Sequence, residues 1–229
     1  MSDLLTYSRD ERVASITLDD GKVNALSIPM LRELHAALDQ AEADGAVVVL
    51  GGREGYFSAG FDLRVFREEP EHLLEMLRLG ATLCERLLSF PTPVLAACGG
   101  HAIAAGSFLL LAADARIGVD GSFKIGMNEV QIGLTMPLFV VELARYRLAP
   151  AHFDRAVVSA VMYEPEDAVT AGFLDRVVAP ADLAEASAAA AAELAGLNAE
   201  AHAATKLRAR GAALAAIREA IDAEFPAPS

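Results

Sequence analysis

The chain has 229 residues, of which 54% are hydrophobic, and its formal net charge is −13. This length can bury a large single core, whereas the excess of acidic residues argues against nucleic-acid binding, which relies on Lys and Arg contacts to phosphates. With no strongly apolar run of about 20 residues, no signal-peptide pattern and two cysteines without zinc or disulfide spacing, we expect a cytoplasmic protein that binds neither membranes nor a metal.

Apolar runs and turn residues predict alternating strands and helices along the chain. Strands are predicted at residues 5–7, 13–18, 47–50, 94–98, 116–119 and 123–125. Helices are predicted at residues 27–44, 71–90, 105–113, 136–148 and 151–161. Residues 64–80 are the hardest to interpret, and their charged cluster at 67–70 suggests a mobile loop. From residue 181 onward the chain is rich in alanine and is predicted to be helical throughout.

Three segments between these elements contain candidate catalytic groups. FSAGFDL at 57–63 and GGHAIAAG at 99–106 are each predicted to form a turn of small residues between a strand and a helix. Two such turns can direct two backbone N–H groups at one oxygen and stabilise negative charge on it. The third segment, GMNEVQIG at 126–133, supplies one carboxylate, Glu129. This combination suits proton transfer next to a thioester carbonyl.

The three segments resemble the crotonase superfamily, which includes enoyl-CoA hydratases and enoyl-CoA isomerases. Further matching segments lie at residues 23–27, 91–96, 114–116 and 168–178. The resemblance implies an α/β fold in which strand-strand-helix units form a spiral over residues 1–180. Residues 181–229 would form a C-terminal helical region that covers the CoA and supports a homotrimer or hexamer. It also implies an acyl-CoA thioester as substrate, as in fatty acid metabolism, and no separate cofactor.

The resemblance also assigns roles to individual residues. The backbone N–H groups of Phe61 and Ala105 would form an oxyanion hole for the thioester oxygen. Residues expected to contact the CoA or the acyl group are Lys22, Ala25, Leu26, Ala59, Asp62, Leu63, Arg64, Gly106, Phe108 and Leu134. Lys22 or Arg64 could meet the CoA phosphates, and Asp62 is expected to cap the helix that follows it. Lys206 lies in a segment similar to one near the CoA nucleotide, although a solvated helix lysine is the simpler interpretation.

Phe108 is where the chain departs from the hydratases of this superfamily. They carry one glutamate at that position and a second at the position of Glu129, and the two carboxylates activate a water molecule. One base is enough to move a double bond from the 3,4 to the 2,3 position of an acyl-CoA. We expect Phe108, Met127 and Leu134 to keep Glu129 partly desolvated and to raise its pKa. The pair Asn128-Glu129, followed by Ile132-Gly133 and Met136-Pro137, resembles the isomerase branch more than the hydratase branch.

Three alternatives stay open. The protein could be an enoyl-CoA hydratase despite Phe108, it could hydrolyse a thioester, or it could be a catalytically silent CoA-binding trimer. His101 and Tyr56 lie beside the turns, but no Ser or Cys partner accompanies His101 at the spacing of a catalytic triad. We expect both side chains to be structural.

Overall fold

The computed structural model describes residues 4–226. Residues 1–3, on which the expectation about a signal peptide rests, and residues 227–229 lie outside this range. A central sheet of six strands is formed, in spatial order, by β1 (Leu5–Asp10), β2 (Val13–Leu18), β4 (Val47–Gly51), β7 (Val94–Cys98), β9 (Ala115–Val119) and β11 (Arg176–Val178). The pair β1–β2 is antiparallel, and the remaining neighbours are parallel.

Short strands continue the chain beyond three strands of the central sheet. A second sheet contains β5 (Gly55–Ser58), β8 (Gly100–Ile103) and β10 (Ile125–Gly126), and a separate pair contains β3 (Ala25–Leu26) and β6 (Gly60–Phe61). Each of β4, β7 and β9 is therefore followed by a strand of the second sheet and then by helical segments. This repeat confirms the predicted α/β spiral of strand-strand-helix units.

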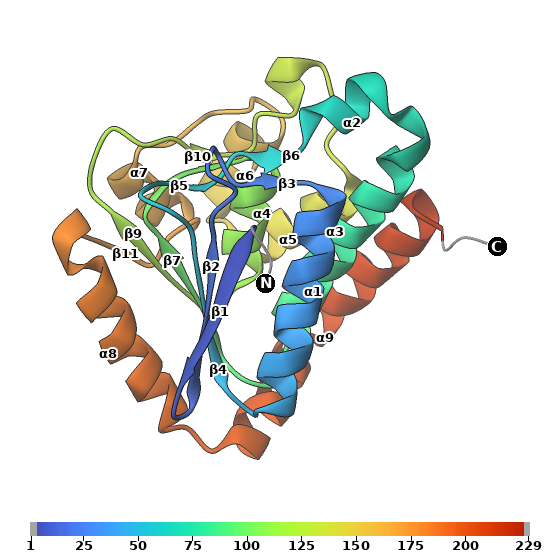
Figure 1. Ribbon diagram of the computed structural model, residues 1–229. Helices are drawn as coiled ribbons and strands as arrows, with labels where there is room; N and C mark the ends of the chain where they lie inside the picture. The colour runs from blue at the N-terminus through green and yellow to red at the C-terminus, as the bar shows by residue number, and fades with distance from the viewer. Residues whose placement is uncertain (1–3, 227–229) are drawn as a thin grey trace.

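Helices cover both faces of the central sheet. They are α1 (Ile28–Ala43), α2 (Leu63–Glu68), α3 (Leu73–Ser89), α4 (Ala105–Ala112), α5 (Leu138–Arg147), α6 (Pro150–Val157), α7 (Pro165–Ala171), α8 (Leu183–Ala195) and α9 (Ala199–Glu224). On one side α1, α3 and α9 lie next to one another, and α8 packs on the opposite face (Figure 1). Within residues 4–226, no helix combines the length and the hydropathy needed to cross a lipid bilayer.

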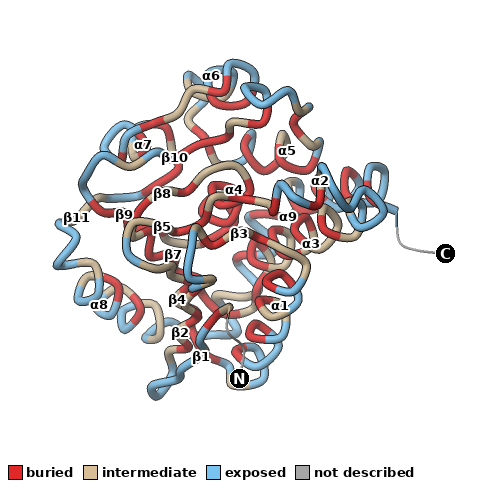
Figure 2. Tube along the Cα trace, turned by 45° about the horizontal axis from the view of Figure 1, so that its top comes forward, coloured by how far each residue is buried: buried red, intermediate tan, exposed pale blue. Residues whose placement is uncertain are grey.

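The core is centred on α4. All eight of its residues are buried, and Figure 2 shows buried residues concentrated in α4 and in the strands around it. A smaller apolar cluster between the sheet and α8 includes Leu95, Ile117 and Ala191. Because α4 begins at the second small-residue turn, burial of the whole helix fixes the position of that turn.

Several element predictions are confirmed and two are wrong. Ser27 accepts a hydrogen bond from Met30 N at 3.4 Å and caps α1, as expected. The charged cluster at 67–70 does not form a loop, because it lies at the end of α2 and the start of a 3-10 turn, Pro70–His72. The C-terminal tail is not helical throughout, since the chain turns after α8 and Asn198 starts α9 by accepting from Ala201 N at 2.9 Å.

The prediction that Lys206 is solvated is also wrong. Its side chain is buried in α9, and Nζ donates to Asp114 Oδ2 at 2.6 Å. Arg210, one turn further along α9, lies 2.7 Å from the other oxygen of Asp114. Desolvation lowers the pKa of Lys206 to about 8 despite this carboxylate. The lysine therefore anchors α9 to the start of β9.

Candidate active site

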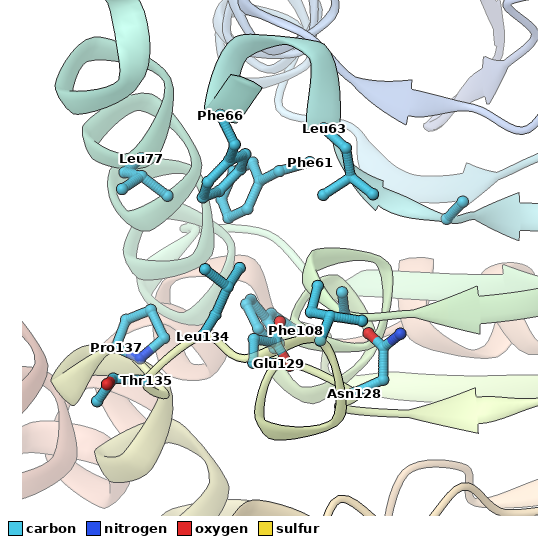
Figure 3. Close-up of a pocket in the computed structure, with 13 residues that line it drawn as sticks. Phe61, Leu63, Phe66, Leu77, Phe108, Asn128, Glu129, Leu134, Thr135 and Pro137 are labelled. Carbon is cyan, nitrogen blue, oxygen red and sulfur yellow. The ribbon is translucent and has the colours of Figure 1, made fainter. Parts of the chain in front are cut away.

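A cavity of about 250 Å³ lies between two layers of the molecule. One layer contains β6, α2 and α3, and the other contains α4 and the segment that follows β10 (Figure 3). The residues that line it are Ala59, Phe61, Leu63, Phe66, Leu77, Ala104, Phe108, Asn128, Glu129, Ile132, Leu134, Thr135 and Pro137. Most of these side chains are apolar, so the cavity suits a hydrocarbon chain next to a few polar groups.

Glu129 is the carboxylate of this cavity. It follows β10 and begins the tight turn at Val130–Ile132, where its carbonyl oxygen accepts from Leu134 N at 2.9 Å. The residue is 6% exposed, and no hydrogen-bond partner of its Oε2 is found within residues 4–226. Burial raises the pKa of Glu129 to about 7, as the apolar neighbours predict. At neutral pH this carboxyl group can both take up and release a proton.

The two small-residue turns touch each other beside Glu129. A Cβ atom added to Gly60, whose φ is +90°, would lie 2.8 Å from Ala104 Cβ and 3.0 Å from Ala105 N. A Cβ atom on Gly106 would lie 2.3 Å from Ser58 O. Only glycine fits at these two points, because any side chain would push the turns apart.

This contact brings two backbone N–H groups to the same region. Directly after β6, Asp62 N donates across to Leu26 O on β3 at 3.4 Å. Successive N–H groups of a strand point to opposite edges, so the Phe61 N–H is directed away from β3. Ala105 is the first residue of α4, where an N–H group has no partner inside the helix. Both groups can therefore donate to a ligand.

The structure brings six of the predicted site residues together around the cavity. They are Ala59, Phe61, Leu63, Phe108, Glu129 and Leu134. Ala105 and Gly106 start α4 directly after the lining residue Ala104. The predicted contact residues outside the cavity lining are Lys22, Ala25, Leu26, Asp62 and Arg64. Met127 is fully buried but does not line the cavity.

The two basic residues proposed for the CoA phosphates differ in their surroundings. Lys22 is exposed on a loop whose backbone is held by Asp20, which accepts from Lys22 N at 2.8 Å. Arg64 folds back onto Asp62, with 2.6 Å between Nη2 and Oδ2. The same carboxylate accepts from Arg64 N and caps α2, as predicted. Part of the charge of Arg64 is therefore already matched by Asp62.

Phe108 forms an apolar wall behind the cavity. It is 1% exposed and meets Phe139 edge to face, with ring centroids 6.1 Å apart. Phe139 in turn contacts Phe225 at the end of α9, also at 6.1 Å. This row of three rings provides no acceptor for a water molecule at the position of Phe108.

Asn128 is the most informative lining residue that was not among the predicted site residues. Its Oδ1 is buried and, like Glu129 Oε2, has no partner among the residues described. Its position directly before Glu129 in the segment 126–133 is the sequence feature that could have identified it. Phe66 and Leu77 also line the cavity but come from the segment 64–80, which contains no recognisable motif.

His101 and both cysteines have structural surroundings, as expected. His101 Nδ1 accepts from Lys124 N at 3.0 Å, and its ring lies near those of Tyr56 and Phe123. Cys84 and Cys98 are buried, which raises the pKa of each thiol to about 12. A thiol with so high a pKa is a poor nucleophile.

Glu129→Gln is expected to stabilise the protein above pH 8 by about 3 kcal/mol and to change its stability little near pH 4. The carboxyl pKa rises from 4.5 to about 7 on folding, so the folded state favours the protonated form, and the wild type loses stability as the pH rises through this interval. Gln is neutral and of similar size. Urea unfolding of both proteins at the two pH values measures the effect. An equal difference at both values would contradict it.

Comparison with known proteins shows the family of the chain. The family model described as enoyl-CoA hydratase/isomerase matches residues 8–225. A probable enoyl-CoA hydratase of Mycobacterium avium is 34% identical over 227 residues, which cover 96% of this chain and 82% of the relative. A solved enoyl-CoA hydratase/isomerase family protein from Pseudomonas syringae is 48% identical, with a TM-score of 0.95 and 97% of both chains covered.

A second solved relative, from Mycobacterium tuberculosis, is called an enoyl-CoA isomerase in one structure and a probable enoyl-CoA hydratase in another. It is 44% identical, its TM-score is 0.92, and the match covers 98% of this chain and 100% of that one. The names of these relatives thus include both hydratase and isomerase, and their matches span nearly the whole chain. The chain belongs to the enoyl-CoA hydratase/isomerase family.

Proposed function

We propose that the protein moves the double bond of a 3-enoyl-CoA to the 2,3 position, with Glu129 as the only acid/base. The observation that carries this proposal is the buried carboxyl group, whose Oε2 has no partner among residues 4–226. It lies in an apolar cavity with Phe108 in place of a second carboxylate. The relative from Mycobacterium tuberculosis carries both names, isomerase and probable hydratase, so the proposal rests on the cavity and not on that name.

The reaction needs one proton to be taken up and returned. Glu129 removes a proton from C2, and the electrons left behind spread over the dienolate to the thioester oxygen. The N–H groups of Phe61 and Ala105 donate to that oxygen while it carries negative charge. Glu129 then delivers the proton to C4, which leaves the double bond between C2 and C3. A carboxyl pKa of about 7 suits both halves of this transfer.

The apolar walls would favour isomerisation over hydration. Water that enters the cavity competes for the dienolate or adds to the product, and it needs hydrogen-bond partners to stay there. Phe108 and Leu134 offer none. The proposed substrate is an acyl-CoA thioester, with Lys22, Ala25 and Arg64 on the CoA side and the cavity on the acyl side. Assembly into a homotrimer or hexamer is part of the same proposal.

Hydration of a 2-enoyl-CoA is the second candidate, and Asn128 is the observation that favours it. Asn128 lines the same cavity as Glu129, and its buried Oδ1 has no partner in the part of the chain that the structure describes. An amide oxygen accepts a hydrogen bond as a carboxylate does, so Asn128 could hold the water that a second glutamate holds in hydratases.

Assays with 3-hexenoyl-CoA and with 2-hexenoyl-CoA separate the two reactions. Isomerisation forms the conjugated 2-enoyl thioester from the first substrate, whereas hydration removes that conjugation from the second. We expect turnover of the 3-enoyl substrate and little hydration. Hydration that is lost in Asn128→Ala would favour the second candidate, and release of free CoA would indicate thioester hydrolysis. Binding of both thioesters without turnover would indicate a catalytically silent protein.

A further inference from the structure

Gly80 lies in the middle of α3, where it contacts the ring of Phe61. A Cβ atom at position 80 would lie 2.4 Å from Phe61 Cε1 and 2.5 Å from Cζ. Real Cβ atoms do not approach carbon so closely, so the ring occupies the space that a side chain at position 80 would fill. The three atoms nearest to this added Cβ all belong to Phe61.

Glycine is unfavourable at this position by helix propensity alone. It is less favourable than alanine in the interior of a helix because its backbone loses more freedom on folding. Gly211 in α9 is also inside a helix, but a Cβ atom there would meet nothing within 4 Å. Both glycines therefore lie inside helices, but Gly80 has a ring packed against it and Gly211 has open space beside it.

The Phe61 ring also forms part of the cavity wall. Figure 3 shows the rings of Phe61 and Phe66 near Leu77, across the cavity from Leu134 and Pro137. Leu77 precedes Gly80 by three residues, which places both on the same face of α3. The backbone at Phe61 is held by the pairing of β6 with β3. A ring pushed away from α3 has to turn about its side-chain bonds, and the open space next to it is the cavity.

We propose that Gly80 is a positioning residue that keeps the Phe61 ring against α3 and so leaves room in the cavity for long acyl chains. This inference rests on the proposed function, because it assigns the same cavity to the acyl chain. Gly80 contacts the ring and acts through it. A methyl group at position 80 would narrow the cavity at its α3 end and would select against long chains.

The dissociation constants of butanoyl-CoA and octanoyl-CoA, measured by titration calorimetry, test this inference. Both thioesters are saturated, so neither reacts. Gly80→Ala is expected to raise the dissociation constant of octanoyl-CoA about tenfold relative to that of butanoyl-CoA, the usual effect of one methyl group in an apolar pocket. Gly211→Ala is the matched control and should leave the ratio unchanged. Phe61→Leu keeps the backbone N–H and removes ring atoms, so Gly80→Ala/Phe61→Leu should restore the wild-type ratio.

Binding of the two thioesters by the wild type separates a failure of the proposed function from a failure of this inference. If the wild type binds neither thioester, the proposed function fails and this inference fails with it. If the wild type binds both and Gly80→Ala keeps the ratio, only the inference is overturned. If Gly80→Ala does not fold but the double variant does, the ring contact is supported, and Phe61→Leu alone must then favour octanoyl-CoA. Failure of both Gly80 variants to fold would show that another group occupies this space and would overturn the inference.

Discussion

Glu129→Gln is expected to lower kcat/KM for 3-hexenoyl-CoA by roughly 100- to 10,000-fold, the usual contribution of a positioned acid or base. Gln has nearly the size of Glu and can still accept a hydrogen bond, but it cannot take a proton from C2. The oxyanion donors that we propose are backbone groups, which this substitution does not alter. The loss should therefore appear in kcat, while the affinity for an unreactive acyl-CoA should stay close to that of the wild type.

The pH dependence of the wild type gives a second measurement of the same group. Only the carboxylate form of Glu129 can act as the base, and its pKa is raised to about 7 by burial. We expect kcat/KM to fall as the pH is lowered through 7 and to level off above it. Glu166→Gln, an exposed site on α7, is the control and should not change the rate. Retained turnover in Glu129→Gln would show that another group moves the proton.

Loss of activity and gain of stability are expected from the same substitution. The buried carboxyl group has no partner for its Oε2 within residues 4–226, so its charged form is unfavourable in the folded protein. The Glu129→Gln variant keeps the packing and removes this charge. A site that must hold a reactive group in an apolar cavity is therefore expected to reduce the stability of the fold.

Local features explain why much of the fold was predictable. Ser27 and Asp62 each cap the helix that follows within three residues, so their roles depend on neighbouring sequence. The strands β4 and β7 are continuous apolar runs because both faces of the parallel sheet are covered. The small residues of the two turns are needed where Gly60 approaches Ala105 and Gly106 approaches Ser58. Each of these signals lies within a few residues of the feature that it predicts.

Long-range contacts explain why the other features could not be predicted from the sequence. The partner of Lys206 is 92 positions earlier in the chain, so a helical lysine could not be recognised as buried from its neighbours alone. Leu77 and Phe66 reach the cavity only because α2 and α3 fold over it. The contact between Gly80 and the ring of Phe61 joins residues 19 positions apart, so no periodicity within α3 predicts it.

Asp114→Asn is expected to lower the free energy of unfolding by about 3–5 kcal/mol, the usual result of removing one partner from a buried ion pair. Asp114 accepts from Lys206 Nζ at 2.6 Å and from Val94 N at 2.7 Å, and it lies 2.7 Å from Arg210. The amide would leave two buried cations without a matching charge. Because these residues anchor α9, whose end carries Phe225 against Phe139, the row of rings behind the cavity should also loosen.

Urea unfolding at pH 7 measures this loss, and two further variants show its cause. Asp222→Asn removes an exposed carboxylate that lies 3.8 Å from Arg78, and an exposed pair contributes at most about 1 kcal/mol. In Asp114→Asn/Lys206→Met one of the unpaired cations is also removed, so part of the lost stability should return. If Asp114→Asn destabilises no more than Asp222→Asn, the buried cluster does not hold α9. A double variant no more stable than Asp114→Asn would show that the unpaired Lys206 is not the cause of the loss.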